Sequence, residues 1–136
     1  MQLEEYEEKL RTLPCCACVK GEWTTTMLRY GEYEGSAVSF LHHPYGGSMS
    51  TRGVYKSSNS KVSDWLQLPI CYNHHQGQEG IHRIGIREWE QVYGEQAFFV
   101  DNLSDLFRLD VWELAGEKKE RKYKPPKKLL PRNNNA

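Results

Sequence analysis

All five histidines of this 136-residue sequence stand close to cysteines, glycines or a proline. Three of them and one cysteine fall within SDWLQLPICYNHHQGQEGIHRIG, residues 63–85, and the other two form the pair in FLHHPYGG. Imidazole nitrogens and thiolates are the side-chain groups that bind zinc and related divalent ions most readily. These segments therefore predict metal sites, and the alternative is a chance cluster of polar residues.

Two segments have the spacing of a zinc knuckle. CCAC contains Cys15 and Cys18, and ICYNHH contains Cys71 and His74 at the same interval. Two such pairs held together supply the four ligands of a closed tetrahedral structural Zn²⁺ site. Cys16 is an additional thiol that could replace Cys15 as a ligand. The alternative is that the cysteines are buried free thiols and that His74 is an exposed polar residue.

The remaining histidines form a second candidate site. His42 and His43 end a predicted strand, and because side chains alternate along a strand, they point to opposite sides. His75 directly follows a predicted zinc ligand, and two glycines after it allow the chain to bring His82 back toward His75. A strand–loop–helix element of this kind can hold one divalent cation. The alternative is that His42 and His43 are ordinary hydrogen-bonded residues of the strand. In that case His82 would be a surface residue without a metal.

The elements that must position these residues follow from the spacing of apolar residues and from the Gly and Pro positions. In chain order we expect a helix over 3–13, a β-hairpin over 22–43, a loop over 44–61, an extended segment over 65–71, and helices over 86–93 and 95–114, the last being the longest. This mixture predicts an α+β fold in one domain, residues 1–116, followed by a flexible tail, residues 117–136.

Composition places the chain among globular proteins, with 38% hydrophobic and 26% charged residues. No apolar run approaches the roughly 18–20 residues of a membrane span, and the acidic N-terminal segment does not have the pattern of a signal peptide. We therefore expect no membrane partner and a cytoplasmic location. Four cysteines in such a compartment are more often thiols or metal ligands than disulfides.

The net charge is zero, but its distribution is uneven. The tail 117–136 has eight basic against two acidic residues, so it carries +6 and the remainder carries −6. Its basic residues are Lys118, Lys119, Arg121, Lys122, Lys124, Lys127, Lys128 and Arg132. A basic tail on an acidic remainder favours an anionic partner, with DNA as the first candidate. The alternative is that the tail only improves solubility. Among aromatic residues, only Tyr45 and Tyr55 are predicted to lie where they could meet DNA.

The strings AVSFLHH, KVSDWLQLPICYNHH, GIH and WEQVYG, with a glycine-rich loop after the first, resemble the HNH (His-Me finger) endonucleases. The chain looks most similar to the phage recombination-enhancement nucleases, which cut DNA together with the RecA recombinase. The resemblance covers about residues 14–105 and is strongest from Lys61 to Gly94. It implies a zinc-stapled ββα-metal core with flanking helices and a metal-dependent DNA endonuclease acting in recombination.

The resemblance also implies roles for individual residues. His43 would be the general base that takes a proton from the attacking water. A catalytic Mg²⁺ or Mn²⁺ ion, which would polarise the scissile phosphate, would be held by His42, His75 and His82. Lys61 and Asp64 would support the ligands or contact phosphate. The implied partners are DNA and a RecA-type recombinase filament, in the cytoplasm of a bacterial host cell.

Three features depart from the family pattern. Val19 replaces a glycine after the first knuckle, Arg83 replaces a small residue, and the loop after the histidine pair is longer and richer in serine. Neither Asn59 nor Asn73 is a convincing match for the middle residue of HNH. Two other functions stay open: a non-catalytic zinc-stapled module that binds DNA or protein, and a phage regulatory or inhibitor protein that reuses the nuclease fold.

Overall fold

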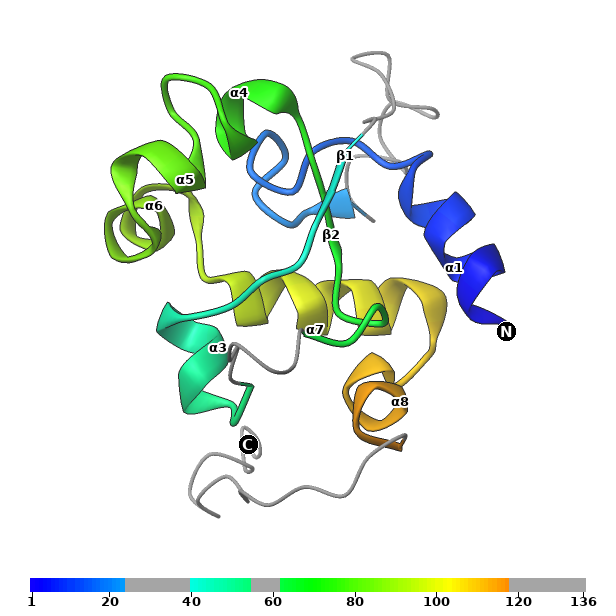
Figure 1. The fold of residues 1–136 in the computed structure, drawn as a ribbon. Coiled ribbons are helices and arrows are strands. Elements are labelled where there is room, and N and C mark those ends of the chain that lie inside the picture. Colours follow the sequence, from blue (N-terminus) through cyan, green and yellow to red (C-terminus); the bar gives the residue numbers. More distant parts are fainter. Residues whose placement is uncertain (24–39, 55–61, 118–136) are drawn as a thin grey trace.

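The computed structural model describes residues 1–23, 40–54 and 62–117. The described elements are α1 (Leu3–Leu10), β1 (Phe40–His42), α3 (Gly47–Thr51), β2 (Leu68–Ile70), α4 (Tyr72–His75), α5 (Ile81–Ile84), α6 (Ile86–Tyr93), α7 (Gln96–Phe107) and α8 (Val111–Glu117). The two strands lie in the middle of the molecule, with α7 crossing beneath them, α1 on one side and α4–α6 on the other (Figure 1). The fold is thus a small, mostly helical α+β domain, as predicted in outline.

The helix predicted over 3–13 is confirmed as α1, although it ends three residues earlier, at Leu10. Tyr6 and Leu10 on one face are fully buried, and Leu13 beyond the helix is buried as well. Pro14, which has no amide hydrogen to continue the helical pattern, follows directly. The chain then enters the cysteine segment, where the Cys16 amide donates to the Pro69 carbonyl oxygen at 2.9 Å. This bond attaches the first knuckle to β2.

The sheet is formed by two strands that are distant in sequence. β1 and β2 are antiparallel, with Phe40 opposite Ile70, Leu41 opposite Pro69 and His42 opposite Leu68. All three residues of β2 are buried, which agrees with the predicted extended segment. The predicted hairpin over 22–43 gave β1 a partner within residues 22–30. Residues 24–30 lie outside the described part of the chain, and the described partner of β1 is β2.

The predicted loop over 44–61 contains a short helix, α3, and this part of the prediction is wrong. Gly, Ser and Thr are weak helix formers, so the sequence pattern does not indicate a helix there. Contacts with other elements stabilise it instead. The Ser48 hydroxyl donates to a Glu90 carboxylate oxygen at 2.6 Å, and the side chain of Met49 is fully buried. Residues 55–61 of the loop, including Lys61, lie outside the described residues.

The predicted long helix over 95–114 is two helices, which is a second correction. Arg108 has φ 53° and ψ 50°, the left-handed conformation that ends many helices, and α7 stops at Phe107. The Asp110 carboxylate then accepts a hydrogen bond from the Glu113 amide at 3.1 Å, near the start of α8. The apolar residues continue across this break, which explains why the pattern predicted one helix.

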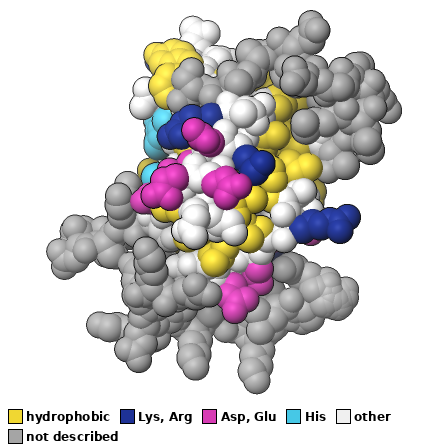
Figure 2. Space-filling view, turned by 90° about the vertical axis from the view of Figure 1, so that its right-hand side faces the viewer, with side chains coloured by type: hydrophobic (Ala, Val, Ile, Leu, Met, Phe, Trp, Pro, Cys, Tyr) yellow, Lys and Arg dark blue, Asp and Glu magenta, His cyan; other side chains and the backbone are white. Residues whose placement is uncertain are grey.

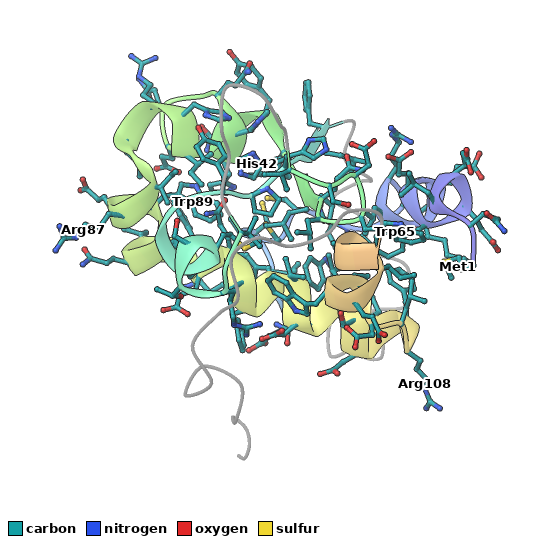
Figure 3. The ribbon with its side chains drawn as sticks, turned by 60° about the horizontal axis from the view of Figure 1, so that its bottom comes forward. Met1, His42, Trp65, Arg87, Trp89 and Arg108 are labelled. Carbon is teal, nitrogen blue, oxygen red and sulfur yellow. The ribbon has the colours of Figure 1, made fainter. Side chains whose placement is uncertain are left out.

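The core lies between the strands and the helices that surround them. Its largest fully buried side chains include Trp23, Trp89, Tyr6 and Phe99. The predicted helix over 86–93 is confirmed as α6: it buries Trp89 and ends before Gly94, whose φ is 127°. Figure 3 shows Trp89 and His42 toward the middle of the molecule, while Arg87 and Arg108 project outward. Within the described residues, no helix is long and apolar enough to cross a membrane.

Candidate metal centres

The structure brings the two knuckles together. The ligand atoms of Cys15, Cys18, Cys71 and His74 all lie within 4.8 Å of one another. The Nδ1 atom of His74 is 3.6 Å from the Cys15 sulfur, 3.6 Å from the Cys18 sulfur and 3.2 Å from the Cys71 sulfur. We refer to these four residues as the Cys3His cluster.

The Cys3His cluster has the dimensions of a tetrahedral zinc site. With Zn–S of about 2.3 Å and Zn–N of about 2.0–2.1 Å, a tetrahedron separates sulfur from nitrogen by about 3.5 Å and two sulfurs by about 3.8 Å. The Cys18 and Cys71 sulfurs are 4.0 Å apart. Three thiolates and one imidazole are a common structural donor set for Zn²⁺. The donor chemistry and the spacing therefore both fit a structural zinc.

Cys15 belongs to this cluster and Cys16 does not. The hydrogen bond with the Cys16 thiol is the main cause that lowers the pKa of Cys15 to about 4, which favours the thiolate that a metal needs. Complete burial raises the pKa of Cys16 well above its usual value. Of the two alternatives left by the sequence, Cys15 is the residue placed to act as a ligand.

His74 has one main-chain hydrogen bond and one nearby carboxylate. The indole nitrogen of Trp89 donates to the His74 carbonyl oxygen at 3.1 Å, and so connects α4 to α6. The other ring nitrogen of His74, Nε2, is 3.8 Å from a carboxylate oxygen of Glu79, which also accepts a hydrogen bond from the Tyr93 hydroxyl at 3.2 Å. A carboxylate behind the outer nitrogen of a histidine is a common second partner in zinc sites.

A second group consists of His42, His75 and His82, whose ligand atoms also lie within 4.8 Å of one another. We refer to it as the histidine triad. The Nε2 atoms of His75 and His82 are 3.1 Å apart. Two nitrogens bound to one ion at about 2.0–2.1 Å are separated by about 3.0–3.4 Å, so this pair has the spacing of two ligands.

The triad combines β1 with two helices. His42 is buried on β1, His75 is partly buried at the end of α4, and His82 is exposed on α5. Burial lowers the pKa of His42 to about 4 and also lowers the pKa of His75. Both rings are therefore neutral near pH 7, which is the form that binds metal.

Gln96 determines which nitrogen of His42 carries the proton. The Gln96 amide nitrogen lies 2.9 Å from the Tyr45 carbonyl oxygen and 3.3 Å from a Glu90 carboxylate oxygen. Both partners are acceptors, so the NH₂ group must face them and Oε1 must face His42. Oε1 is 2.9 Å from Nε2 of His42, which therefore donates. The lone pair of Nδ1 remains for a metal.

His43 lies apart from the triad, as the alternation of the strand predicts. Its Nε2 atom is 2.9 Å from a carboxylate oxygen of Asp64, and both side chains are more than a third exposed. A carboxylate accepts a hydrogen bond and cannot donate one when ionised. The pair thus places the His43 proton on Nε2 and leaves Nδ1 as an acceptor.

Some predicted site residues cannot be placed. Lys61 and the basic residues of the tail, Lys118, Lys119, Arg121, Lys122, Lys124, Lys127 and Lys128, lie outside the described residues, as does Asn59. Asn73 is described, and its amide donates to Glu79 at 3.2 Å. Asn73 therefore contacts the same carboxylate that lies near His74.

Sequence reasoning missed three residues that support the two centres. Gln96 and Glu90 form the network behind His42, and Glu79 lies behind His74. Gln96 is separated from His42 by 54 positions, so no short motif joins these two residues. One signal in the sequence could have identified Gln96. The helical pattern of α7 places this polar residue in the core, where it needs a hydrogen-bond partner.

Comparison of the chain with protein-family models, with curated proteins and with solved structures finds no match. The function is therefore inferred from the two centres and from the residues around them.

Proposed function

We propose that this protein is a metal-dependent DNA endonuclease of the HNH type that hydrolyses phosphodiester bonds. One observation carries the proposal: three histidines bring their ligand atoms together, and the residue that follows one of them, His43, has a ring oriented by Asp64. A closed structural site does not need such a neighbour. The combination is the minimum for hydrolysis, since it provides both a metal-binding group and a general base.

His43 is the proposed base. Because Asp64 accepts the hydrogen bond from Nε2, the lone pair of Nδ1 can take a proton from a water molecule. Asp64 would hold the ring in this tautomer and stabilise the positive charge that the ring acquires. The His43 side chain is exposed and is not enclosed by the core, which leaves room for a phosphodiester.

His42, His75 and His82 are the proposed ligands of the catalytic ion. A divalent ion bound there would polarise the scissile phosphate and stabilise the leaving oxygen. Three protein ligands leave coordination positions open for phosphate and water. Three imidazoles favour transition-metal ions, whereas Mg²⁺ prefers oxygen ligands. Of the two ions expected from the resemblance, Mn²⁺ is therefore favoured over Mg²⁺.

The Cys3His cluster would act as a structural staple. It attaches α4 to the segment after α1, and α4 also carries His75. A zinc ion in this cluster would therefore hold one ligand of the catalytic ion in position without taking part in the chemistry.

DNA is the proposed substrate, and the basic tail is the proposed non-specific contact to it. On the face in Figure 2, the described Lys and Arg side chains are interleaved with Asp and Glu, and histidine side chains reach its edge. Because the basic side chains on this face are accompanied by acidic ones, the net positive charge that attracts DNA phosphates would come from the tail. A phage origin, a role in recombination and a RecA-type filament as partner are proposed from the resemblance alone.

A plasmid-nicking assay tests the proposal. Wild type should nick supercoiled DNA with added Mn²⁺ and more slowly with Mg²⁺. His43→Ala should bind DNA and Mn²⁺ normally but cut about 100- to 10,000-fold more slowly, since that is the usual contribution of a general base. His75→Ala should bind Mn²⁺ more weakly and recover partly at higher concentrations. DNA binding without cutting under any divalent ion would instead support a non-catalytic binding module.

A further inference from the structure

Two exposed aromatic rings lie beside the histidine triad. Among the described residues, the large hydrophobic side chains with high exposure are Met1, Phe40, Tyr72, Val92 and Phe98. Phe40 and Tyr72 are 40% and 58% exposed, yet they contact each other with ring centroids 6.2 Å apart. Single exposed apolar residues are ordinary, whereas a pair next to a polar site requires an explanation.

The backbone places this pair on the same side as the metal ligands. Phe40 and His42 are two residues apart on β1, so their side chains leave the same face of the strand. Tyr72 and His75 are three residues apart on α4, which puts them on one side of the helix. The ring centroid of Phe40 is 6.1 Å from that of His75, and the ring of His75 is 4.7 Å from that of His82. The aromatic surface therefore continues into the triad.

We propose that Phe40 and Tyr72 form a stacking site for an unpaired nucleobase of single-stranded DNA. The inference rests on the proposed function, because the occupant is deduced from a phosphodiester held at the triad. A base is joined to its phosphate through one sugar, so a strand bound at the ligands must carry a base across the neighbouring surface. Among the described residues, the exposed aromatic side chains on this side are Phe40 and Tyr72.

The exposed ring faces select an unpaired base. In a duplex, each base is already stacked on its neighbours and presents only its edges in the grooves. In a single strand, the π-face of a base is free and can stack on an aromatic side chain, whatever the sequence. The aromatic residues favoured by the sequence are less suitable. Tyr45 packs against the core and Tyr55 lies outside the described residues.

The experiment compares single-stranded and duplex DNA with the full chain, without added Mg²⁺ or Mn²⁺, so that binding is measured without cutting. The probe is an oligonucleotide that contains 2-aminopurine, whose fluorescence is quenched by stacking. Wild type should quench the single strand, and Tyr72→Ala should bind it about 5- to 150-fold more weakly. The duplex affinity of Tyr72→Ala should change less than twofold. Tyr72→Trp should retain the quench, because it retains the ring.

Phe98→Ala is the matched control, since Phe98 is 51% exposed on α7 and has no contact with the triad among the ring pairs described. It should bind both DNA forms as wild type does. Zinc content and melting temperature, measured for each variant, should be unchanged, because the Tyr72 side chain is largely outside the core.

The outcomes separate this inference from the proposed nuclease. Unchanged single-strand binding by Tyr72→Ala, or equal losses for both DNA forms, overturns the stacking site, and a wild type that still nicks plasmid leaves the nuclease standing. A quench that depends on Tyr72 in a chain that never cuts supports the stacking site and overturns the nuclease.

Discussion

The Nε2 atom of His42 donates a hydrogen bond to Oε1 of Gln96 across 2.9 Å in a site where both side chains are buried. The orientation of the Gln96 amide is itself fixed by two acceptors, the Tyr45 carbonyl oxygen and the Glu90 carboxylate. A residue at the start of α7 thus determines which nitrogen of His42 can bind an ion.

Gln96→Leu should therefore weaken metal binding at the triad. The substitution keeps much of the side-chain volume but removes the acceptor, so His42 can adopt the other tautomer. The loss of such a supporting partner typically lowers metal affinity about 10- to 100-fold. Calorimetric titration with Mn²⁺ measures the affinity, and ¹⁵N NMR of the His42 ring reports the tautomer directly.

Asn102→Leu is the control for this prediction. Asn102 is another amide on α7, and its side chain donates to the Gly21 carbonyl oxygen at 3.1 Å, away from His42. It should lower stability without changing Mn²⁺ affinity. Equal Mn²⁺ affinities for Gln96→Leu and wild type would show that Gln96 is only a packing residue.

Asp64→Ala should slow cutting without weakening Mn²⁺ binding. The carboxylate accepts the hydrogen bond from His43, so its loss affects the orientation of the base. We expect a decrease of about 10- to 1,000-fold in rate, smaller than that of His43→Ala, because the base itself remains. Single-turnover cleavage gives the rate. Asp105→Ala, an exposed acidic residue on α7, should cut like wild type. A rate for Asp64→Ala equal to that of its control would exclude an orienting role.

Cys71→Ser should lower zinc content and thermal stability together. A structural zinc contributes roughly 10 kcal/mol or more to the folding of small zinc-binding peptides. Elemental analysis and a thermal melt measure the two quantities. Leu103→Ala is the control, because that side chain is fully buried but lies outside the Cys3His cluster. It should retain zinc and lose only packing stability. Purified wild type without zinc, prepared without chelator, would contradict the staple.

Removal of residues 118–136 should weaken DNA binding and reduce its dependence on salt. Up to eight phosphate contacts would be lost, and each contributes about 0.9 to the slope of log affinity against log salt on duplex DNA. The cut spares α8, which ends at Glu117. A tail of equal length with Gln in place of Lys and Arg should bind as weakly as the truncated chain. Unchanged affinity at low salt would identify the tail as a solubilising terminus.

Both candidate centres could be predicted because their residues occur in short, regular patterns. Two ligand pairs with two residues between them fix the local geometry of the Cys3His cluster, and the alternation along β1 separates His42 from His43. The network behind His42 could not be predicted. A glutamine becomes a partner of His42 only after α7 packs beneath the sheet, and no local spacing encodes that contact.

The errors in the predicted fold have a similar origin. Four of the five residues of α3 are weak helix formers, and the helix is tied to α6 by the bond between Ser48 and Glu90, two residues 42 positions apart. The break at Arg108 interrupts a segment whose apolar residues suit a continuous helix. In both places a tertiary contact or a single backbone conformation outweighs local propensity.

The adjacency of His74 and His75 on α4 has a consequence for how this segment can vary in length. Successive residues of a helix are rotated by about 100°, so the peptide bond between these histidines sets the angle between the Cys3His cluster and the triad. One residue inserted between them would turn His75 away from His82 while leaving Cys71 and His74 at their spacing. Substitutions of Tyr72 or Asn73 remove no ligand from either centre. Insertions and deletions between Cys71 and His75 are not compatible with both centres, so the length of this stretch is constrained more strictly than its composition.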